Sequence, residues 1–268
     1  MKWLYFALLS LVFWAVSAQP ATPARLRFVG APGSVSVAAP TFIQEAETVW
    51  SNTSNPKTTA SFDVLLGDVL VAFSVIENSG SAVGISGGSL TWTLQQSVTA
   101  SFYCQLFLWT AVVDADKSMS VTFTRSGNTY YFGGNVLTFR GSDGIGNSSV
   151  TNVASGAPTL NITTTQANSA IVLTNGDWNA SDGASRVWRT NAGALSETSY
   201  FRNTTNYAIY GGYHADAGAI NTYAVGLSAP SGQGYSIAAV EVLGSAAAAV
   251  SDPPFLFVRN PMGRYRRM

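Results

Sequence analysis

The chain has 268 residues, of which 47% are hydrophobic and only 10% are charged, so it has enough apolar surface to fold and is not a disordered protein. Fourteen Lys and Arg balance fourteen Asp and Glu, and this zero net charge argues against nucleic-acid binding. The single cysteine, Cys104, excludes an intramolecular disulfide, and we expect it to be a small buried apolar residue.

The N-terminal sequence MKWLYFALLSLVFWAVSAQP has the three parts of a secretory signal peptide. Lys2 provides the positive start, residues 4–16 form the apolar run, and Val16-Ser17-Ala18 is a small-residue cleavage site. We therefore expect removal of residues 1–18 and a secreted or extracellular mature chain that begins at Gln19. An uncleaved membrane anchor is the alternative, although the apolar run is short for a span. No later segment is apolar enough to cross a bilayer.

The segment GDVLVAFSVIENSG, Gly67–Gly80, contains a turn followed by the first strand that we expect to be buried. Gly67 and Asp68 are typical turn residues, and the run that follows is apolar on both of its alternating faces. Such a strand is expected in the interior, covered on both sides.

The other runs in the mature region are short and alternate between apolar and polar residues. SMSVTFT (118–124) and LTWTLQQS (90–97) have the period of two that is typical of half-buried strands. No helical stripe occurs beyond the signal peptide, and the pattern predicts an all-β protein.

A similar order of features returns about one hundred residues later along the chain. Four matches carry the duplication: GDVLVAF with NSAIVLT, Trp92 with Trp188, Val121 with Val225, and NVLTFRG with AAVEVLG. They predict two pseudo-repeats, at about 61–141 and 164–244, each with about five strands. We therefore expect residues 19–244 to form an antiparallel, jelly-roll-like β-sandwich. Two tandem small sandwiches are the alternative, because residues 141–158 read either as a crossover loop or as a linker.

The pattern GDxLVA, then a Trp-containing strand, then FRG resembles uncharacterised, duplicated β-sandwich modules of bacterial secreted proteins and bacteriophage tail or virion proteins. The matching residues are Gly67, Asp68, Trp92 and Phe139-Arg140-Gly141. The resemblance covers about residues 61–244 and implies no catalytic residues. Such modules usually have a proline in the turn before the tryptophan, where this chain has SGGSLTW.

The C-terminal residues 245–268 differ in composition from the rest of the chain. A small-residue hinge and a Pro-Pro pair precede four arginines, Arg259, Arg264, Arg266 and Arg267. This basic tail reads as a solvated end, with an arm that binds an acidic or aromatic partner as the alternative.

Nucleophilic catalysis has a weak basis in this sequence. The only histidine, His214, has Asp216 two residues away, and no GxSxG motif is present. We interpret His214 as a loop or strand-end residue without a catalytic role.

Paired carboxylates for glycoside hydrolysis are also weakly indicated. Asp114 and Asp116 lie where a hairpin turn is expected. Glu241 interrupts an apolar strand, and because its repeat partner is Thr138 we expect it to face solvent. The chain is therefore predicted to be no enzyme and to need no cofactor, with a glycoside hydrolase kept as an alternative.

The loop NGDWNASDGAS (175–185) is the candidate ligand-binding site, with Asp177, Trp178, Asn179 and Asp182 as its residues. An aromatic ring beside amide and carboxylate groups suits a sugar. Ser181 adds an oxygen ligand for calcium, but the spacing departs from that of an EF-hand and we predict no metal site.

A second aromatic-rich stretch follows in TSYFRNTTNYAIYGGYH (198–214), where alternation should bury about half of the rings. We expect a secreted or surface-displayed protein with a structural or adhesive role and a glycan or cell-surface partner. A bacteriophage virion component is the alternative.

Overall fold

The structure is a computed structural model, and it describes residues 36–77, 81–99, 104–127, 129–178, 185–203 and 207–246. It also describes the backbone of 257–259 and 265–267. The predicted signal peptide and most of the basic tail lie outside these residues. Every regular element of three or more residues in the described part is a β-strand, which confirms the all-β prediction.

The first repeat forms two main sheets. The five-stranded sheet, in spatial order, contains β2 (Thr41–Glu47), β11 (Phe132–Arg140), β5 (Val69–Glu77), β8 (Cys104–Val112) and β7 (Thr93–Val98). The three-stranded sheet contains β3 (Lys57–Thr58), β10 (Val121–Arg125) and β6 (Val83–Gly87). A short pair joins β4 (Phe62–Val64) to β9 (Lys117–Met119).

The second repeat has the same two sheets in the same strand order. Its five-stranded sheet contains β12 (Ile145–Gly156), β19 (Gln233–Val242), β14 (Ala170–Trp178), β17 (Tyr207–His214) and β16 (Leu195–Arg202). Its three-stranded sheet contains β13 (Thr159–Thr163), β18 (Thr222–Ala229) and β15 (Val187–Trp188). Two further pairs are β1 (Val37–Ala38) with β20 (Ser245–Ala246), and β21 (Phe257–Arg259) with β22 (Tyr265–Arg267).

The strand register supports the duplication as well. Val69 lies opposite Phe139 in the first repeat, and Ala170 lies opposite Val242 in the second, so NVLTFRG and AAVEVLG occupy equivalent places. Within each repeat the chain passes back and forth between the five-stranded and the three-stranded sheet, as in a jelly roll. Each repeat is therefore a two-sheet sandwich.

Both repeats begin earlier than the sequence matches indicated. They start at the edge strands β2 and β12, and the segment 141–158, read as a crossover loop or a linker, contains the whole of β12. Edge strands such as β2 carry a mixed pattern of exposed and partly buried residues, so their apolar signal is weak.

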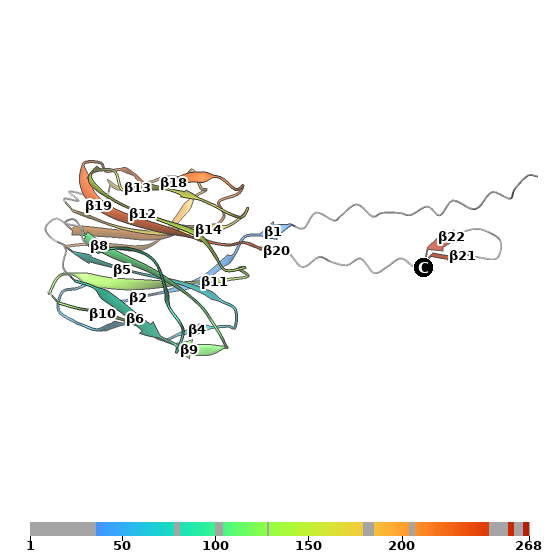
Figure 1. Cartoon of the computed structure of the whole chain (residues 1–268), viewed down its shortest axis with the longest axis horizontal. Helices are drawn as coiled ribbons and strands as arrows, with labels where there is room; N and C mark the ends of the chain where they lie inside the picture. Colours follow the sequence, from blue (N-terminus) through green and yellow to red (C-terminus); the bar gives the residue numbers. More distant parts are fainter. Residues whose placement is uncertain are drawn as a thin grey trace, which may run out of the picture. The chain divides into compact units, whose positions relative to one another are not determined.

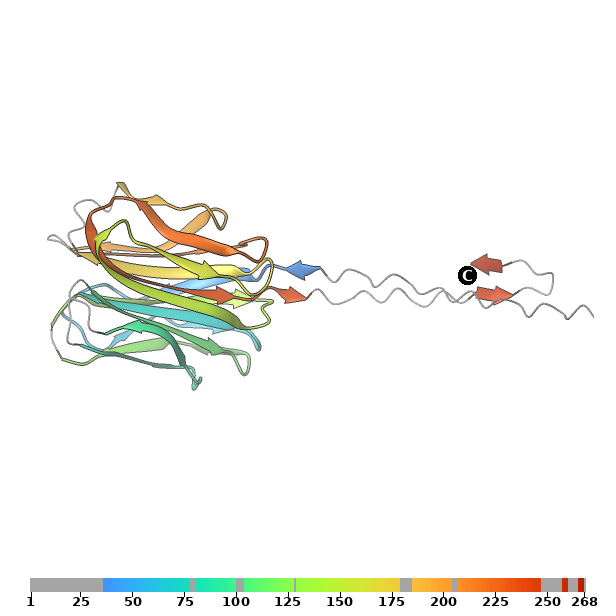
Figure 2. The same ribbon diagram turned by 45° about the horizontal axis from the view of Figure 1, so that its top comes forward.

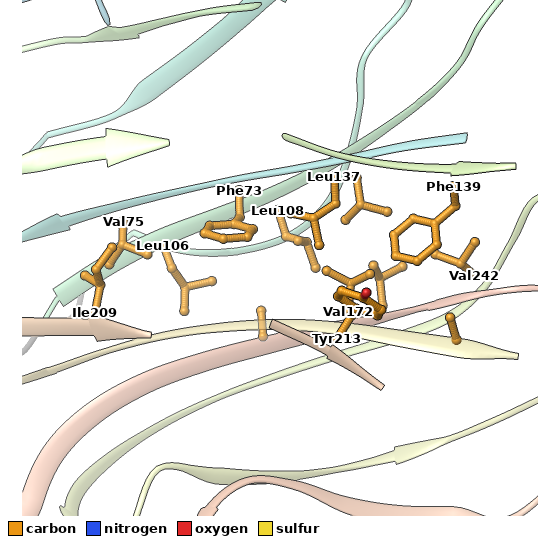
Figure 3. Packing of buried hydrophobic residues seen from close by; sticks show 14 of the residues in the cluster. Phe73, Val75, Leu106, Leu108, Leu137, Phe139, Val172, Ile209, Tyr213 and Val242 are labelled. Atoms are coloured by element: carbon orange, nitrogen blue, oxygen red, sulfur yellow. The ribbon is translucent and has the colours of Figure 1, made fainter. Parts of the chain in front are cut away.

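The two five-stranded sheets pack face to face, and each is covered on its other side by the three-stranded sheet of its own repeat (Figures 1 and 2). Phe73, Leu108, Val172 and Ile209 belong to the core between the five-stranded sheets (Figure 3). The alternate residues of β5 point into the core of the first sandwich instead. This layering explains why β5 is apolar on both faces.

The contact between the repeats is close. A Cβ atom on Gly211 would lie 2.5 Å from Phe73 Cζ, and one on Gly176 would lie 2.6 Å from Cys104 Sγ. Cys104 is fully buried, and its thiol donates to the carbonyl of Gly176 at 2.7 Å. Burial raises the pKa of this thiol to about 12, so Cys104 has the structural character that the sequence predicted.

One of the repeat matches is wrong. Trp188 lies in β15 opposite Leu227, whereas Phe123, the equivalent of Leu227, lies opposite Ile85 in the first repeat. Trp92 precedes β7 and has no strand partner of this kind. The two tryptophans therefore hold different positions, Trp188 in β15 and Trp92 just before β7.

Candidate functional site

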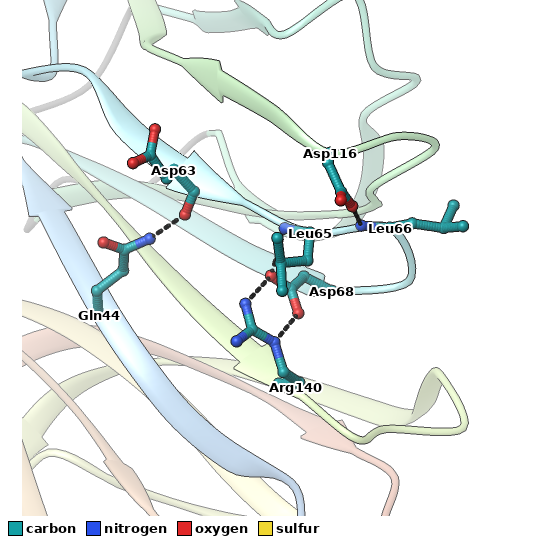
Figure 4. Close-up of polar contacts among 7 residues, drawn as sticks. All are labelled: Gln44, Asp63, Leu65, Leu66, Asp68, Asp116 and Arg140. Carbon is teal, nitrogen blue, oxygen red and sulfur yellow. Dashed lines mark hydrogen bonds and ion pairs between the residues drawn. The ribbon is translucent and has the colours of Figure 1, made fainter.

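The GD and FRG motifs meet in an ion pair between the buried Asp68 and the partly exposed Arg140 (Figure 4). Arg140 Nε and Nη2 each lie 2.8 Å from an oxygen of Asp68, and the backbone N–H of Leu65 donates to Asp68 at 2.9 Å. Burial would raise the pKa of Asp68, but these donors outweigh it and lower the pKa overall. The motif residues thus fix the turn that leads into β5.

Glu241 holds the equivalent turn in the second repeat, where Ser169 occupies the position of Asp68. It accepts hydrogen bonds from the backbone N–H groups of Thr165 (2.8 Å), Gln166 (3.1 Å) and Asn147 (3.0 Å), and from the Ser169 hydroxyl. Burial would raise its pKa, but these donors lower it. Glu241 is fully buried, so the expectation that it faces solvent is wrong; the strand face that carries it is enclosed by the turn before β14.

The other candidate catalytic groups also have local structural partners. Asp116 accepts the backbone N–H of Leu66 at 2.7 Å, and Asp114 forms an ion pair with Lys117. His214 ends β17 and is buried, and its Nδ1 lies 3.0 Å from the carbonyl oxygen of Gly193. Asp216 accepts the N–H of Gly218 instead of orienting His214.

The predicted ligand loop is only partly described. Asn179, Ser181 and Asp182 lie outside the described residues. Asp177 and Trp178 end β14, and because consecutive strand residues point to opposite faces, they do not share a surface. Asp177 points into the second sandwich and is fully buried, whereas Trp178 lies on the face toward the first repeat. The expected exposed pair of Asp177 and Trp178 is therefore wrong.

A different aromatic surface lies close to Asp177, on the outer strands of the second sandwich. We call it the Tyr200 cluster, and it consists of Arg186, Trp188, Glu197, Tyr200 and Tyr210. The Arg186 guanidinium lies 4.0 Å from the centre of the Tyr200 ring and forms an ion pair with Glu197. Trp188 Nε1 donates to Glu197 at 2.9 Å. Tyr200 stacks on Tyr210 with ring centres 5.6 Å apart.

Exposure distinguishes the members of this cluster. Tyr200 is 37% exposed, whereas Tyr210 beneath it is fully buried. Both tyrosines belong to the aromatic-rich stretch 198–214 that was noted in the sequence. Arg186 and Glu197 carried no sequence signal, because Arg186 precedes β15 of the three-stranded sheet and Glu197 lies in β16 of the five-stranded sheet, and they meet only in the folded second repeat.

An open pocket of about 360 Å³ lies in the first repeat, beside the turn before β7. Its lining includes the hydroxyl groups of Ser89, Thr91, Thr93 and Thr110 and the partly exposed Val112. It has no aromatic ring in its wall, so it offers a sugar less apolar contact than the Tyr200 cluster does.

Comparison with protein-family models, with curated proteins and with solved structures finds no significant match for this chain. Within the described ranges, no helix has the length and apolar character needed to span a bilayer. No three His, Cys, Asp or Glu side chains are grouped as metal ligands in that same part of the chain.

Proposed function

We propose that the chain is a secreted or surface-displayed, non-catalytic β-sandwich that binds glycans through the Tyr200 cluster in an adhesive or structural role. The observation that carries the proposal is the partly exposed ring of Tyr200, held beside the charged pair of Arg186 and Glu197. The exposed part of the ring would give a sugar apolar contact, and Arg186 and Glu197 beside it would give a donor and an acceptor for the sugar hydroxyl groups.

The non-catalytic part of the proposal is supported by the structural partners that the candidate carboxylates already have. Asp68, Glu241 and Asp116 accept backbone N–H groups, and Asp114 is paired with Lys117. Acid–base catalysis on a sugar needs two carboxyl groups that face a common substrate. The groups named here are instead used to hold turns.

The test is a panel of immobilised polysaccharides followed by affinity measurements with the best ligand. Tyr200→Ala is expected to weaken binding about tenfold, equivalent to about 1.4 kcal/mol, because the apolar face is lost. Tyr200→Phe keeps the ring and should bind within about twofold of the natural protein.

Leu94→Ala is the matched control, since Leu94 is 50% exposed on β7 of the first repeat and lies outside the cluster. Unchanged affinity in Tyr200→Ala, or an equal loss in Leu94→Ala, would refute this site. Mass spectrometry of the native source tests the location: a chain that begins at Gln19 in cell-free fluid supports secretion. Recovery from purified phage particles would favour the virion alternative.

A further inference from the structure

The interior of the second sandwich contains a group of four buried polar side chains, Asn175, Asp177, Tyr210 and Gln233. They come from β14, β17 and β19 and share the face of the five-stranded sheet that looks away from the first repeat. Asn175, Asp177 and Tyr210 are fully buried, and Gln233 is 2% exposed. Asn175 lies directly opposite Tyr210 in the β14–β17 register.

Most polar atoms of this group have no hydrogen-bond partner among the described residues. They are both amide atoms of Asn175, Oδ1 of Asp177, Oε1 of Gln233 and Oη of Tyr210. The contacts within the group are few: Gln233 Nε2 lies 3.4 Å from Asp177 Oδ2, and the Tyr210 phenol lies close enough to the Asp177 carboxyl to lower its pKa. Buried polar groups are almost always paired, so four neighbours with unpaired atoms call for a specific explanation.

The first repeat shows that the fold does not require polar residues at these positions. The equivalents of Asn175, Asp177 and Tyr210 are Ser74, Ile76 and Phe107, because Ser74 lies opposite Phe107 as Asn175 lies opposite Tyr210. Ile76 and Phe107 pack in the apolar core of the first sandwich, and the Ser74 hydroxyl donates to the Gly133 carbonyl at 2.6 Å. The second repeat alone places unpaired oxygens here.

The chemistry of these atoms indicates what they could bind. Carboxylate, amide and phenol oxygens are hard ligands, which suit hard cations and not soft transition metals. The group contains a single carboxylate, and a buried charge needs a partner of opposite sign. A cation with one positive charge balances it, whereas a divalent cation would leave an excess charge in the core.

We propose that Asn175, Asp177, Tyr210 and Gln233 coordinate an alkali-metal cation, Na⁺ or K⁺, inside the second sandwich. The proposal departs from the sequence-based expectation of no metal site. It can be tested separately from glycan binding, since Asn175, Asp177 and Gln233 lie outside the Tyr200 cluster, and Tyr210, which the two sites share, is the fully buried member of that cluster. Burial raises the pKa of Asp177 to about 7, so a large fraction of this carboxyl is ionised at and above neutral pH.

The experiment is thermal unfolding of the full chain at pH 8 and constant ionic strength in NaCl, KCl or choline chloride. A cation that binds only the folded state raises the melting temperature. We expect Tm to be about 3–6 °C higher in NaCl or KCl than in choline chloride. Equal Tm values in all three salts would overturn the proposal and would indicate that only buried water forms hydrogen bonds with these side chains.

Two variants locate the effect. The triple variant Asn175→Ser, Asp177→Ile, Tyr210→Phe transfers the first-repeat residues to the second repeat and should lose the difference between salts. Asp177→Asn keeps the size of the side chain and should also lose it, which covers the case in which the triple variant does not fold. A salt difference that survives in Asp177→Asn would contradict the proposal.

The matched control is Asp114→Asn, which removes an exposed carboxylate in the first repeat. It should keep the full difference between sodium or potassium and choline. Stabilisation by calcium chloride without any by sodium or potassium would overturn the assignment to an alkali-metal cation.

Discussion

Three buried carboxyl groups in this protein have different environments and opposite pKa shifts. Asp68 and Glu241 accept several hydrogen bonds, which outweigh burial and lower their pKa values. Burial dominates at Asp177, whose pKa rises to about 7 despite the Gln233 and Tyr210 side chains and the charge of Arg202. The number of donors that reach each carboxyl decides the direction of the shift.

Asp177 gives a prediction for the pH dependence of stability. Between about pH 4 and pH 7 the folded protein holds a proton that the unfolded chain has released, so Asp177 lowers stability as the pH rises through this range. Asp177→Asn removes this loss. In choline chloride, we expect the variant to become more stable relative to the natural protein as the pH rises from 4.5 to 8. The difference in unfolding free energy should grow by on the order of 2–4 kcal/mol, and the difference in Tm should grow with it.

Calorimetry at several pH values checks this prediction. The groups nearest to the carboxyl, Gln233, Tyr210 and Arg202, are unchanged in the variant. A Tm difference that is constant across the range would show that Asp177 has an ordinary pKa in the folded protein.

At the scale of elements, the main strands depend on carboxylates that close the turns before them. Gln166 stands four residues before Ala170, as Leu65 stands four residues before Val69, and each has its N–H bound to a buried carboxylate. The carboxylate comes from the turn itself in the first repeat and from β19 in the second. The two repeats therefore keep the same turn with different residues.

Glu241→Ala tests the importance of this turn. The loss takes this acceptor from the backbone N–H groups of Thr165 and Gln166 and from the buried Ser169 hydroxyl, and we expect a destabilisation of about 2–4 kcal/mol in urea unfolding. Because the pKa of Glu241 is lowered in the folded state, its stabilisation is present above its unfolded pKa and is lost as the pH falls below it.

Asp114→Asn serves as the comparison, since Asp114 belongs to an exposed ion pair, and it should leave stability nearly unchanged. If Glu241→Ala were as mild as this control, the hydrogen bonds to Glu241 would contribute little to the fold.

At the scale of the whole molecule, two sandwiches share one large apolar interface. Phe73, Leu108 and Val172 lie in the core between the five-stranded sheets (Figure 3). Gly211 allows the backbone to approach Phe73 closely. A sheet with an uncovered apolar face of this size is prone to association. Neither sandwich is expected to be stable in solution without the other.

Separate expression of residues 36–141 and 145–246 tests this expectation. Each fragment should aggregate or associate, because its five-stranded sheet exposes the face that the other repeat covers. Co-expression should recover a one-to-one complex by size-exclusion chromatography. A soluble, folded and monomeric single fragment would contradict it.

The fold was largely predictable from the sequence, whereas the site was not. The apolar faces of β5, the duplication and the jelly-roll-like sandwich follow from patterns along short segments. The edge strand β12 was missed because only part of it is buried. Trp178 was grouped with Asp177 because they are adjacent in sequence, yet strand alternation sends them to opposite faces.

The sequence by itself therefore determined the all-β class, the doubly covered strands and the repeat, because burial along a strand has a local period of two. The tertiary structure alone decided that Glu241 is buried, that Arg186 and Glu197 meet over Tyr200, and that four polar side chains gather in the second sandwich. These groups come from strands far apart in the chain, and only the pairing of the sheets brings them together.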